Sequence, residues 1–420
     1  MKVCVIGNGG REHALAWRLS ISPSVTKVYA IPGSAAMSDC AELVGIDWQQ
    51  SDHLISFLKD NHVDLVVVGP EAPLVAGLAD VLNKAGIPVF GPSKAAAQLE
   101  GSKVFAKDLM KKYNIPTAAY GVFHKVDEAK EFIGQTGAPI VVKADGLAAG
   151  KGVVVAMTVE EANAAVEDML SGNRFGNAGS TVVIEEFMEG EEASLLAFVD
   201  GKTVVPMIAS QDHKRIFDGD KGPNTGGMGT YAPAPVLTDA LRDEAMKTIL
   251  EPMVAAMEKE GMPYVGCLYA GLMITPQGPK VVEFNARFGD PETQVVLPLL
   301  DSDLGQIMMA CATGTLTADM VKWKDSSAAC VILASKGYPE TSSKGDIISG
   351  DIKQHDTTIV FHSGTKLIGD EYVTNGGRVL GVVGLGKDLR TALDRAYGRI
   401  EHIDFEGMQY RTDIGAKAFK

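Results

Sequence analysis

The sequence predicts a multidomain protein in which an α/β portion is followed by α+β portions. In the first hundred residues, short runs of β-branched residues alternate with helical stretches. After about residue 101 this alternation stops, and paired strands joined by glycine-rich or acidic turns take its place. At about 100–200 residues per domain, a chain of 420 residues has room for two to four domains.

The N-terminal portion reads as a parallel sheet with helices on both faces. Its apolar runs are nearly continuous rather than alternating, which is typical of strands buried on two sides. Glycine or proline follows each run and marks its end. The predicted strands span 3–6, 28–31, 65–68 and 89–90, and the clearest predicted helices span 11–20 and 52–61.

The rest of the chain mixes hairpins and helices. Strands 139–144 and 152–156 are expected to form one antiparallel hairpin, and strands 181–186 and 193–199 a second. A polar, glycine-rich segment at 211–231 has little periodicity, and we expect a long functional loop there. The other predicted elements are helices 102–113, 159–170, 238–260 and 389–400, and strands 265–274 and 280–285.

Composition narrows the functional classes. With 46 % hydrophobic and 22 % charged residues the chain is expected to be globular, and a net charge of -14 argues against a nucleic-acid scaffold. The five cysteines form no C-x-x-C pair, so no zinc or redox motif is present. No apolar run approaches the ~18 residues of a spanning helix. We therefore expect a cytoplasmic protein.

The segment GNGGREH at 7–13 closes a strand and opens a helix. Free backbone N–H groups and the helix dipole favour an anion at such a position. This predicts a site for a phosphate or a phosphosugar. A dinucleotide fingerprint would require glycine at position 12, where this chain has Glu12, so a nicotinamide cofactor is disfavoured. A purely structural tight turn is the remaining alternative.

A second glycine-rich segment, DGLAAGKG at 145–152, lies between two strands. It fails the P-loop template, because the spacing is too short and no Ser or Thr follows the lysine. A glycine-rich hairpin can cover nucleotide phosphates, and an ordinary flexible turn is the alternative. Lys143 on the preceding strand and Lys103 at the start of a helix favour phosphate binding, since lysines act there as point charges.

An acidic run at 185–192 follows another apolar strand. Most such runs are solvated turns, but this one can also present backbone groups to an adenine ring and a carboxylate to ribose hydroxyls.

The segment EFNARFGD at 283–290 is the sharpest signal. Period-two alternation places Glu283, Asn285 and Arg287 on one face while the strand lasts. A carboxylate and an amide oxygen suit Mg²⁺, and the arginine fork suits a carboxylate or a phosphate. The alternative is the polar outer face of an edge strand.

Taken together, these segments resemble the ATP-grasp ligases, and within them the phosphoribosylamine–glycine ligase family. The resemblance runs from residue 1 to about 420. The segments that carry it are GNGGREHA at 7–14, GPEAPL at 69–74, EGSK at 100–103, KADGLAAGKG at 143–152, QDHKR at 211–215, NTGGMG at 224–229 and EFNARFGDPE at 283–292.

The resemblance implies a Rossmann-like N-terminal domain at 1–101 and an ATP-grasp domain at 102–327 that includes a mobile lid at about 120–190. A small mixed C-terminal domain at 328–420 would complete the chain. It also implies the reaction: ATP-dependent ligation of glycine to 5-phosphoribosylamine in de novo purine biosynthesis, giving glycinamide ribonucleotide, ADP and phosphate through a glycyl phosphate. The implied partners are these small molecules, with no nucleic acid and no membrane, and the chain is a monomer or a homodimer.

The resemblance also implies roles for individual residues. Because strand 266–274 has no acidic residue, Glu283 and Asn285 would be the protein ligands of Mg²⁺, or of Mn²⁺ in its place. The catalytic set is Arg287, Asp212 and His213. Those for the co-substrate ATP are Lys103, Lys143, Gly146, Gly150, Lys151, Gly152, Glu185, Glu186, Phe187, Met188 and Glu191; those for phosphoribosylamine are Gly9, Gly10, Arg11, Glu12, His13 and Glu71; and those for glycine are Asp212, Gly227, Arg287 and Asp290.

Three other interpretations stay open from the sequence. One is an ATP-grasp ligase or carboxylase with a different carboxylate and amine. Another is an NAD-dependent oxidoreductase, which Glu12 disfavours. The third is a non-catalytic nucleotide sensor, which the set of lysines, metal ligands and Arg287 disfavours.

Overall fold

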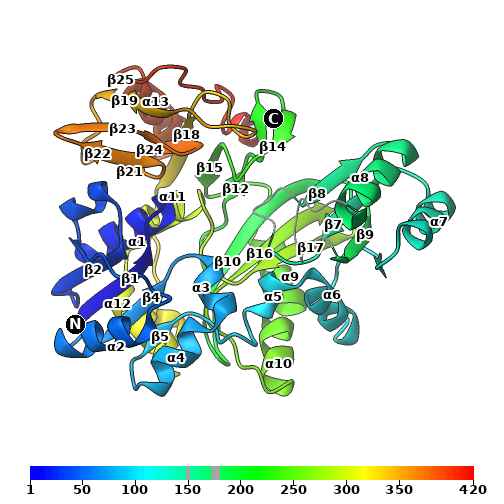
Figure 1. The fold of residues 1–420 in the computed structure, drawn as a ribbon, viewed down its shortest axis with the longest axis horizontal. Helices are drawn as coiled ribbons and strands as arrows, with labels where there is room; N and C mark the ends of the chain where they lie inside the picture. Colours follow the sequence, from blue (N-terminus) through cyan, green and yellow to red (C-terminus); the bar gives the residue numbers. More distant parts are fainter. Residues whose placement is uncertain (148–151, 172–179) are drawn as a thin grey trace.

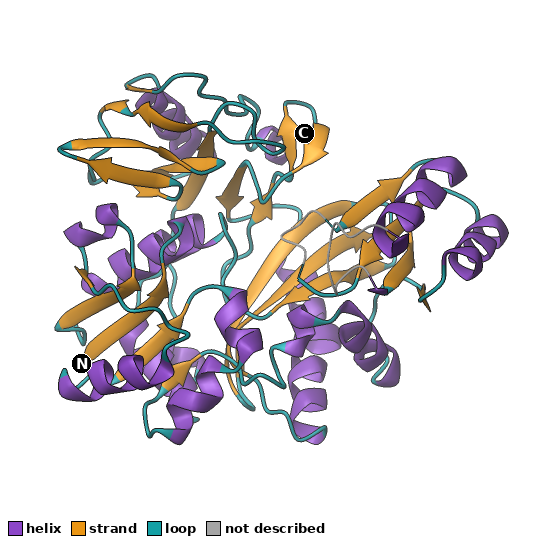
Figure 2. Cartoon of the chain, viewed as in Figure 1, coloured by secondary structure: helices purple, strands orange, loops and turns teal. Residues whose placement is uncertain are grey.

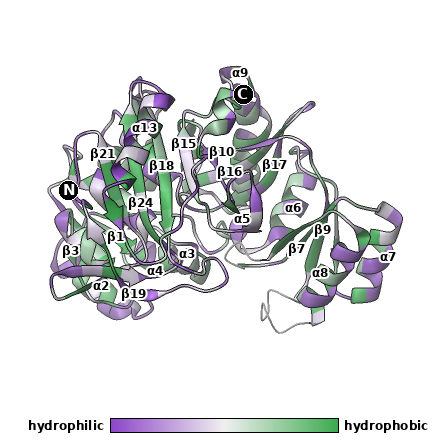
Figure 3. Cartoon of the chain, turned by 90° about the horizontal axis from the view of Figure 1, so that it is seen from above, coloured by the Kyte–Doolittle hydropathy of each residue, from purple (hydrophilic) through white to green (hydrophobic). Residues whose placement is uncertain are grey.

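The computed structural model describes residues 1–147, 152–171 and 180–420. Its strands form four larger sheets and several small ones (Figures 1 and 2). Figure 3 shows the sheets lined with hydrophobic residues while the outer helices carry hydrophilic ones. Among the described residues, none of the helices combines the length and the apolar character needed to cross a membrane.

The N-terminal sheet is parallel, as predicted, and its strand order is β3-β2-β1-β4-β5. Its two central strands are buried along almost their whole length, because helices cover both faces. The strands are β1 (Lys2–Gly7), β2 (Lys27–Pro32), β3 (Glu42–Leu43), β4 (Leu65–Val68) and β5 (Val89–Phe90). The helices are α1 (Gly10–Ser20), α2 (Ser51–Asp60), α3 (Glu71–Ala76), α4 (Leu78–Lys84) and α5 (Gln98–Gly101), with a 3₁₀ turn at Ala35–Asp39.

A small antiparallel sheet of order β6-β9-β7-β8 extends away from the rest (Figure 1). Its strands are β6 (Tyr120–Phe123), β7 (Ile140–Ala144), β8 (Val153–Ala156) and β9 (Val182–Glu186). The helices α7 (Val126–Thr136) and α8 (Val159–Ser171) pack together and share a separate hydrophobic cluster with the sheet, while α6 (Lys103–Lys112) leads into it. The hairpin of β7 and β8 confirms the first predicted pair.

The second predicted hairpin is wrong. Strand β9 pairs with β6 and β7, whereas β10 (Glu191–Asp200) belongs to a different sheet and pairs with β16 (Val265–Thr275) along its length. Seven consecutive residues of β10 are buried, so this strand requires neighbours on both edges and cover on both faces. The acidic turn between β9 and β10 therefore carries the chain from one sheet to the next.

The second sheet has the order β11-β10-β16-β17, with β11 at Val204–Pro206 and β17 at Gly278–Asn285. The antiparallel pair β16–β17 confirms the predicted final pair of core strands, and a bulge interrupts it next to Gly271. The predicted helix at 238–260 is continuous but contains a π-helical stretch, Met246–Leu250, between α9 (Asp239–Ala245) and α10 (Glu251–Lys259).

The C-terminal sheet has the order β12-β15-β18-β24-β21 and takes two strands from the segment predicted to be a loop. That segment forms β12 (Gln211–Asp212), β13 (Arg215–Phe217), β14 (Lys221–Asn224) and β15 (Gly229–Ala232), so the loop prediction is wrong. All four strands are short. Strands β13 and β14 pair with each other as a local hairpin, while β15 pairs with the distant β18 and brings β12 into the C-terminal sheet.

The remaining elements complete the C-terminal part. They are α11 (Thr293–Val296), α12 (Leu304–Thr313), β18 (Ser327–Ala334), β19 (Lys344–Ile347), β20 (Ser349–Gly350), β21 (Thr358–His362), β22 (Thr365–Ile368), β23 (Glu371–Asn375), β24 (Arg378–Gly386), α13 (Leu389–Ile400) and β25 (Ile403–Asp404), with short 3₁₀ turns at Leu297–Leu299, Ala318–Met320 and Ala416–Phe419. The helix predicted at 389–400 is confirmed.

One hydrophobic cluster joins residues of the N-terminal sheet, β10, α12 and the C-terminal sheet. It contains Val3 and Leu15 from the first part, Phe198 from β10, Leu304 from α12 and Phe361 from β21. The N-terminal and C-terminal parts therefore lie side by side, as Figure 1 shows, and side chains from both meet at their border.

Replacement of Gly384 by alanine should destabilise the C-terminal sheet. A Cβ at this position of β24 would lie 2.0 Å from the carbonyl oxygen of Ala392 and 2.6 Å from the amide nitrogen of Ala396, both in the backbone of α13. Since the helix would have to move off the sheet, we expect the free energy of unfolding, measured by urea denaturation, to fall by about 3 kcal/mol.

Gly398→Ala on the same helix is the matched control, because nothing lies within 4 Å of its added Cβ. It should leave stability unchanged or raise it by about 1 kcal/mol, as alanine favours a helix. Equal unfolding midpoints for the two variants would contradict the close packing of α13 on β24.

Candidate active site

The N-terminus of α1 is capped by a side chain of the same helix. Glu12 is buried, and its Oε2 accepts a hydrogen bond from the amide of Gly9 at 2.7 Å, while its Oε1 pairs with Arg11 Nε at 2.6 Å. Gly7 and Gly69 leave room for it, since a Cβ at either would lie within 2.4 Å of a Glu12 side-chain atom. Glu12 therefore caps the helix. An anion bound at the Gly9 amide would lie against the buried carboxylate of Glu12, which opposes the predicted anion site.

His13 and Gly10 face the C-terminal part rather than an open site. The backbone amide of His362 donates to His13 Nδ1 at 3.0 Å, and burial, followed by nearby His362, lowers the pKa of His13 to about 3. A Cβ on Gly10 would lie 2.3 Å from Ser363 Oγ. Of the residues expected at phosphoribosylamine, His13 and Gly10 thus join two parts of the chain, which leaves Arg11 and Glu71 as its side-chain candidates.

Arg287 lies in a cluster of carboxylates from the N-terminal part. Its Nη2 pairs with Glu100 Oε1 at 2.9 Å and donates to Asn285 Oδ1 at 3.2 Å, and its Nε lies 3.4 Å from Glu71 Oε2. The other Glu100 oxygen accepts the amide of Ala286 at 2.7 Å. Burial alone would lower the pKa of Arg287, but Glu100 and Glu71 outweigh it and raise that pKa. Glu100 was missed as a site residue, although the segment that contains it had been noted.

Two buried lysines share one buried carboxylate. Lys143 Nζ lies 3.0 Å from Glu185 and donates to the carbonyl of Val282 at 3.1 Å, and Lys107 Nζ lies 3.1 Å from the same carboxylate. The side chain of Glu185 is 3 % exposed, so its carboxylate fixes lysines and is not available to ribose. Burial lowers the pKa of Lys107 to about 8. The sequence did not indicate Lys107, whose helix carries several similar lysines.

A further cation of the candidate site is Lys103, at the start of α6. Asp145 accepts the Lys103 amide at 2.6 Å and so caps the helix, while Lys103 Nζ donates to the carbonyl of Gly146 at 2.9 Å. Gly146 has a φ of +90°, which favours glycine there.

The other predicted residues of this glycine-rich segment are Gly150, Lys151 and Gly152. Gly152 is buried, and its carbonyl accepts a hydrogen bond from the amide of Ala144. Gly150 and Lys151 lie outside the described residues.

The segment expected at adenine and ribose follows β9. Phe187 and Met188 are partly exposed and lie outside regular secondary structure. Glu186 is exposed, and its amide donates to the carbonyl of Ala119 at 2.8 Å, so this donor is taken. Glu191 Oε2 accepts Gln211 Nε2 at 3.2 Å. The backbone beyond Glu186 and the ring of Phe187 are therefore better placed for a base than the carboxylates.

Glu283 and Asn285 lie near the end of β17, beside the cations just described. Burial opposes ionisation of Glu283, but Lys214, Lys143 and Lys103 outweigh it and hold the pKa of this carboxyl below its usual range. Lys214 also pairs with Glu192 at 2.8 Å, and this contact is the main cause of its raised pKa. Lys214 was missed as a site residue, although it lies in a segment that had been noted.

Glu283 and Asn285 together offer two kinds of oxygen ligand, which fits a cation that phosphate oxygens also coordinate. Asn285 is 7 % exposed, and its Oδ1 accepts one hydrogen bond and keeps a second lone pair. In the part of the chain that the structure describes, no group of three or more His, Cys, Asp or Glu side chains forms a closed metal centre. One carboxylate and one amide oxygen suit Mg²⁺ when phosphates and water complete its shell.

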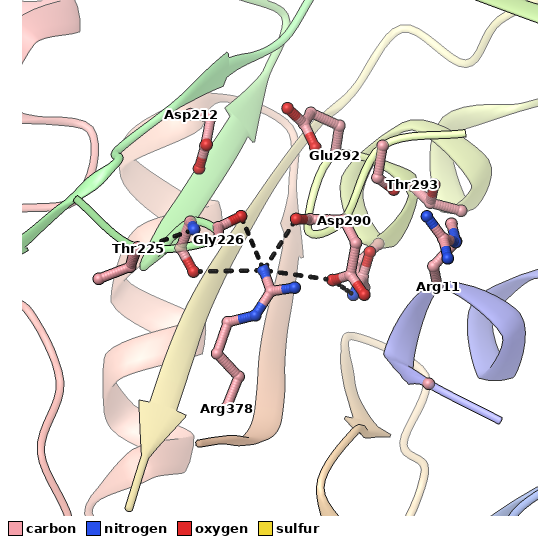
Figure 4. A network of polar contacts seen from close by, with 12 residues as sticks. Arg11, Asp212, Thr225, Gly226, Asp290, Glu292, Thr293 and Arg378 are labelled. Atoms are coloured by element: carbon pink, nitrogen blue, oxygen red, sulfur yellow. Dashed lines mark hydrogen bonds and ion pairs between the residues drawn. The ribbon is translucent and has the colours of Figure 1, made fainter. Parts of the chain in front are cut away.

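A third group of residues surrounds Asp212 (Figure 4). Burial and the neighbouring Glu292 raise the pKa of Asp212 well above its usual value. Gly227 has a φ of +121°, and a Cβ there would lie 2.7 Å from Asp212 Oδ1 and 2.5 Å from Pro291. Burial opposes ionisation of Asp290, but Arg378 outweighs it and lowers the pKa of that carboxyl. Gly227 thus packs against Asp212 and against the turn that contains Asp290, and a ligand shared by these residues stays a prediction.

His213 turns away from this group. Its Nδ1 lies 3.1 Å from the carbonyl of Gly229, and its Nε2 accepts the amide of Gly415 at 3.3 Å. The residue is 1 % exposed, and burial, followed by Arg411, lowers its pKa to about 4. With both ring nitrogens on backbone groups, His213 holds the β12–β15 region to the C-terminal segment, and these contacts do not favour proton transfer to a substrate.

Comparison with known families shows which family the chain belongs to. Three domain models of phosphoribosylglycinamide synthetase match the chain: the N domain at residues 1–100, the ATP-grasp (A) domain at 101–293 and the C domain at 328–417. The chain belongs to the phosphoribosylglycinamide synthetase family. It is 53 % identical over 418 residues to the phosphoribosylamine–glycine ligase of Halalkalibacterium halodurans, covering 100 % of this chain and 97 % of that protein. It is 54 % identical over 421 residues to that of Neisseria meningitidis, covering 100 % and 99 %.

Solved structures agree with this family assignment. The crystal structure of phosphoribosylamine–glycine ligase from Thermotoga maritima matches 99 % of this chain and 100 % of its own, with a TM-score of 0.87 and 34 % identity. The biotin carboxylase domain of the 2-oxoglutarate carboxylase from Hydrogenobacter thermophilus, solved with MgADP and bicarbonate, matches with a TM-score of 0.75 over 97 % and 91 %. At 18 % identity this second match shows the shared ATP-grasp fold alone.

The burial of His213 predicts a pH-dependent stability. Its pKa is about 4 in the folded chain and near 6.5 in an unfolded one, so unfolding takes up a proton between these values. The stability that the neutral ring contributes is present above pH 6.5 and is lost as the pH falls toward 4. Between pH 7 and 5.5, we expect His213→Gln to lose about 1 kcal/mol less unfolding free energy than the wild type.

Urea denaturation at the two pH values measures this difference. His53→Gln, at an exposed position, should keep the wild-type dependence. If His213→Gln also kept it, the ring would be free to ionise in the folded chain and its assignment as a buried neutral group would fail.

Proposed function

We propose that this chain catalyses the ligation of glycine to 5-phosphoribosylamine with ATP, giving glycinamide ribonucleotide, ADP and phosphate. The observation that supports this most is a set of ion pairs that fixes the candidate cations: Glu185 holds Lys143 at 3.0 Å, Glu192 holds Lys214 at 2.8 Å and Glu100 holds Arg287 at 2.9 Å. In the same region Lys214, Lys143 and Lys103 hold the pKa of the Glu283 carboxyl below its usual range. Membership of the family over the whole length places the proposal in purine biosynthesis.

Activation of glycine is the chemical difficulty in this reaction. A carboxylate is a poor acyl donor, because its leaving group would be oxide. Attack of the glycine carboxylate on the γ-phosphoryl group of ATP gives glycyl phosphate and ADP, and the new mixed anhydride has phosphate as its leaving group. The amine of phosphoribosylamine then attacks the acyl carbon, phosphate leaves, and the amide forms.

The first step brings two anions together, and fixed positive charge must offset their repulsion. Lys103, Lys143 and Lys214 supply it in a partly buried pocket, where Glu185 and Glu192 hold two of them in place. A Mg²⁺ or Mn²⁺ ion, held by Glu283 and Asn285, would neutralise charge on the triphosphate oxygens. Together with Gly146, Gly152, Phe187 and Met188 these residues form our proposed ATP site, with the segment at about 120–190 as its lid.

We assign the amino-acid substrate to the space between Arg287 and Asp212. Arg287 orients the glycine carboxylate, and Asp212, with Asp290 nearby, holds the ammonium group in its protonated form, which prevents glycine from reacting with itself. The turn at Gly227 lets the backbone approach the reacting carboxyl. For phosphoribosylamine we propose Arg11 and Glu71 from the N-terminal part, where Glu71 lies 3.9 Å from Arg11 and 3.4 Å from Arg287.

We also propose the division of the chain into 1–101, 102–327 and 328–420, with phosphoribosylamine on the N-terminal side. Strands β12 and β15 lie in the middle segment by this division but pair into the C-terminal sheet. The two segments therefore share one sheet and work as a unit.

A phosphate-release assay tests the function. ATP, Mg²⁺ and phosphoribosylamine should release phosphate only when glycine is added, and mass spectrometry should show glycinamide ribonucleotide. A panel of other amino acids separates this ligase from relatives that use a different carboxylate. Release that ignores glycine, or that follows another acid, would refute the proposal.

Replacement of Glu283 by glutamine should abolish most turnover without unfolding the chain. The change removes a negative charge from beside three lysines while the apolar face of β17 stays intact. We expect kcat to fall by about 10³-fold, and part of the loss to be recovered at high Mg²⁺. Glu189→Gln, in the exposed turn after β9, should behave like the wild type. Wild-type activity of Glu283→Gln at low Mg²⁺ would contradict the assignment.

A further inference from the structure

A single nitrogen of Arg378 joins two turns of the candidate active site (Figure 4). Arg378 is the first residue of β24, in the C-terminal sheet. Its Nη1 donates to the carbonyls of Asp290 at 2.8 Å and Gly226 at 2.9 Å, and the carbonyl of Gly227 lies at 3.5 Å. The same nitrogen lies 3.6 Å from Asp290 Oδ1.

The two turns bound by Arg378 are those that border Asp212. Gly227 approaches so closely that a Cβ there would lie 2.5 Å from Pro291 and 2.7 Å from Asp212 Oδ1. A Cβ on Gly226 would lie 2.9 Å from the Arg378 guanidinium carbon. The position of Asp212 relative to Asp290 therefore depends on how tightly the two turns are held together.

Carbonyl oxygens only accept hydrogen bonds, so a donor must lie between the two turns to join them, and here that donor is Arg378 Nη1. Three carbonyls and the Asp290 carboxylate all point toward the Arg378 guanidinium, whose side chain is 21 % exposed. Hydrogen bonds from a charged donor are about twice as strong as neutral ones, which suits a contact that must fix a substrate pocket.

We infer that Arg378 is a positioning residue for glycine: it clamps the Gly226–Gly227 turn to the Asp290–Pro291 turn and so sets the pocket in which Asp212 holds the amino acid. This inference rests on the proposed function and extends it to the C-terminal part of the chain, where the sequence showed no dense chemical motif. The contacts of Arg378 do not include the lysines of the ATP site.

Steady-state kinetics of Arg378→Met test the inference. Loss of the clamp should raise the KM for glycine by about tenfold or more and lower kcat, while the KM for ATP changes by less than about twofold. Arg378→Lys keeps a charged donor and should recover part of the loss. Arg395→Met, at an exposed position of α13, removes the same charge from the C-terminal part and should match the wild type.

A second variant reaches the same contact from the other side. Gly226→Ala introduces a methyl group against Arg378 without touching its charge, and Gly226 lies at the surface. It should also raise the KM for glycine selectively. In a double-mutant cycle, Arg378→Met and Gly226→Ala should be strongly non-additive, because both break one contact. If Arg378→Met fails to fold, Gly226→Ala decides the question.

The outcomes separate the two proposals. A wild type that shows no glycine-dependent turnover refutes the function itself. An active wild type with unchanged glycine KM in Arg378→Met and Gly226→Ala refutes the clamp. Equal rises in the KM for glycine and for ATP, accompanied by a lower melting temperature, would also refute it, because Arg378 would then be only a structural tie between the two parts.

Discussion

Positive charges held close together around one carboxylate are the constraint on which the rest of the site depends. Burial opposes ionisation of Glu283, but Lys214, Lys143 and Lys103 outweigh it and keep the pKa of this carboxyl below its usual range. Like charges in a partly buried pocket repel, and the repulsion is stronger where water is scarce. A triphosphate with its metal ion is the ligand that we propose for this arrangement. The local architecture is consistent with this, because each cation is fixed before the ligand arrives.

The fixing groups come from distant parts of the chain. Glu185 on β9 holds Lys143, Glu192 on β10 holds Lys214, and Glu100 at the end of the N-terminal part holds Arg287. Each carboxylate thus positions a cation. The acidic run at 185–192 contributes two of them, Glu185 on β9 and Glu192 on β10, in two different sheets. The C-terminal sheet contributes in the same way through Arg378. The candidate site residues therefore come from several parts of the chain, and no part supplies them alone.

Sequence patterns predicted features that depend on near neighbours. Continuous apolar runs predicted the parallel sheet and period-two alternation predicted the polar face of β17. A glycine followed three residues later by a glutamate, here Gly9 and Glu12, is also typical of a capping box, and the structure has this cap where the sequence analysis predicts a phosphate site. Long-range contacts were not readable. Lys107 and Arg378 gain their surroundings from residues far along the chain, and part of the predicted polar loop becomes strand because β15 pairs with the distant β18.

The central claim is that a triphosphate-bound cation and glycine meet between Glu283 and Asp212. Paramagnetic relaxation measures this directly: Mn²⁺ with a non-hydrolysable ATP analogue is added to the protein, and the carboxylate carbon of ¹³C-labelled glycine is observed. We predict a strong relaxation enhancement that needs the ATP analogue, is lost in Glu283→Gln and persists in Glu189→Gln. An enhancement that is absent in the wild type, or unchanged in Glu283→Gln, would contradict the account.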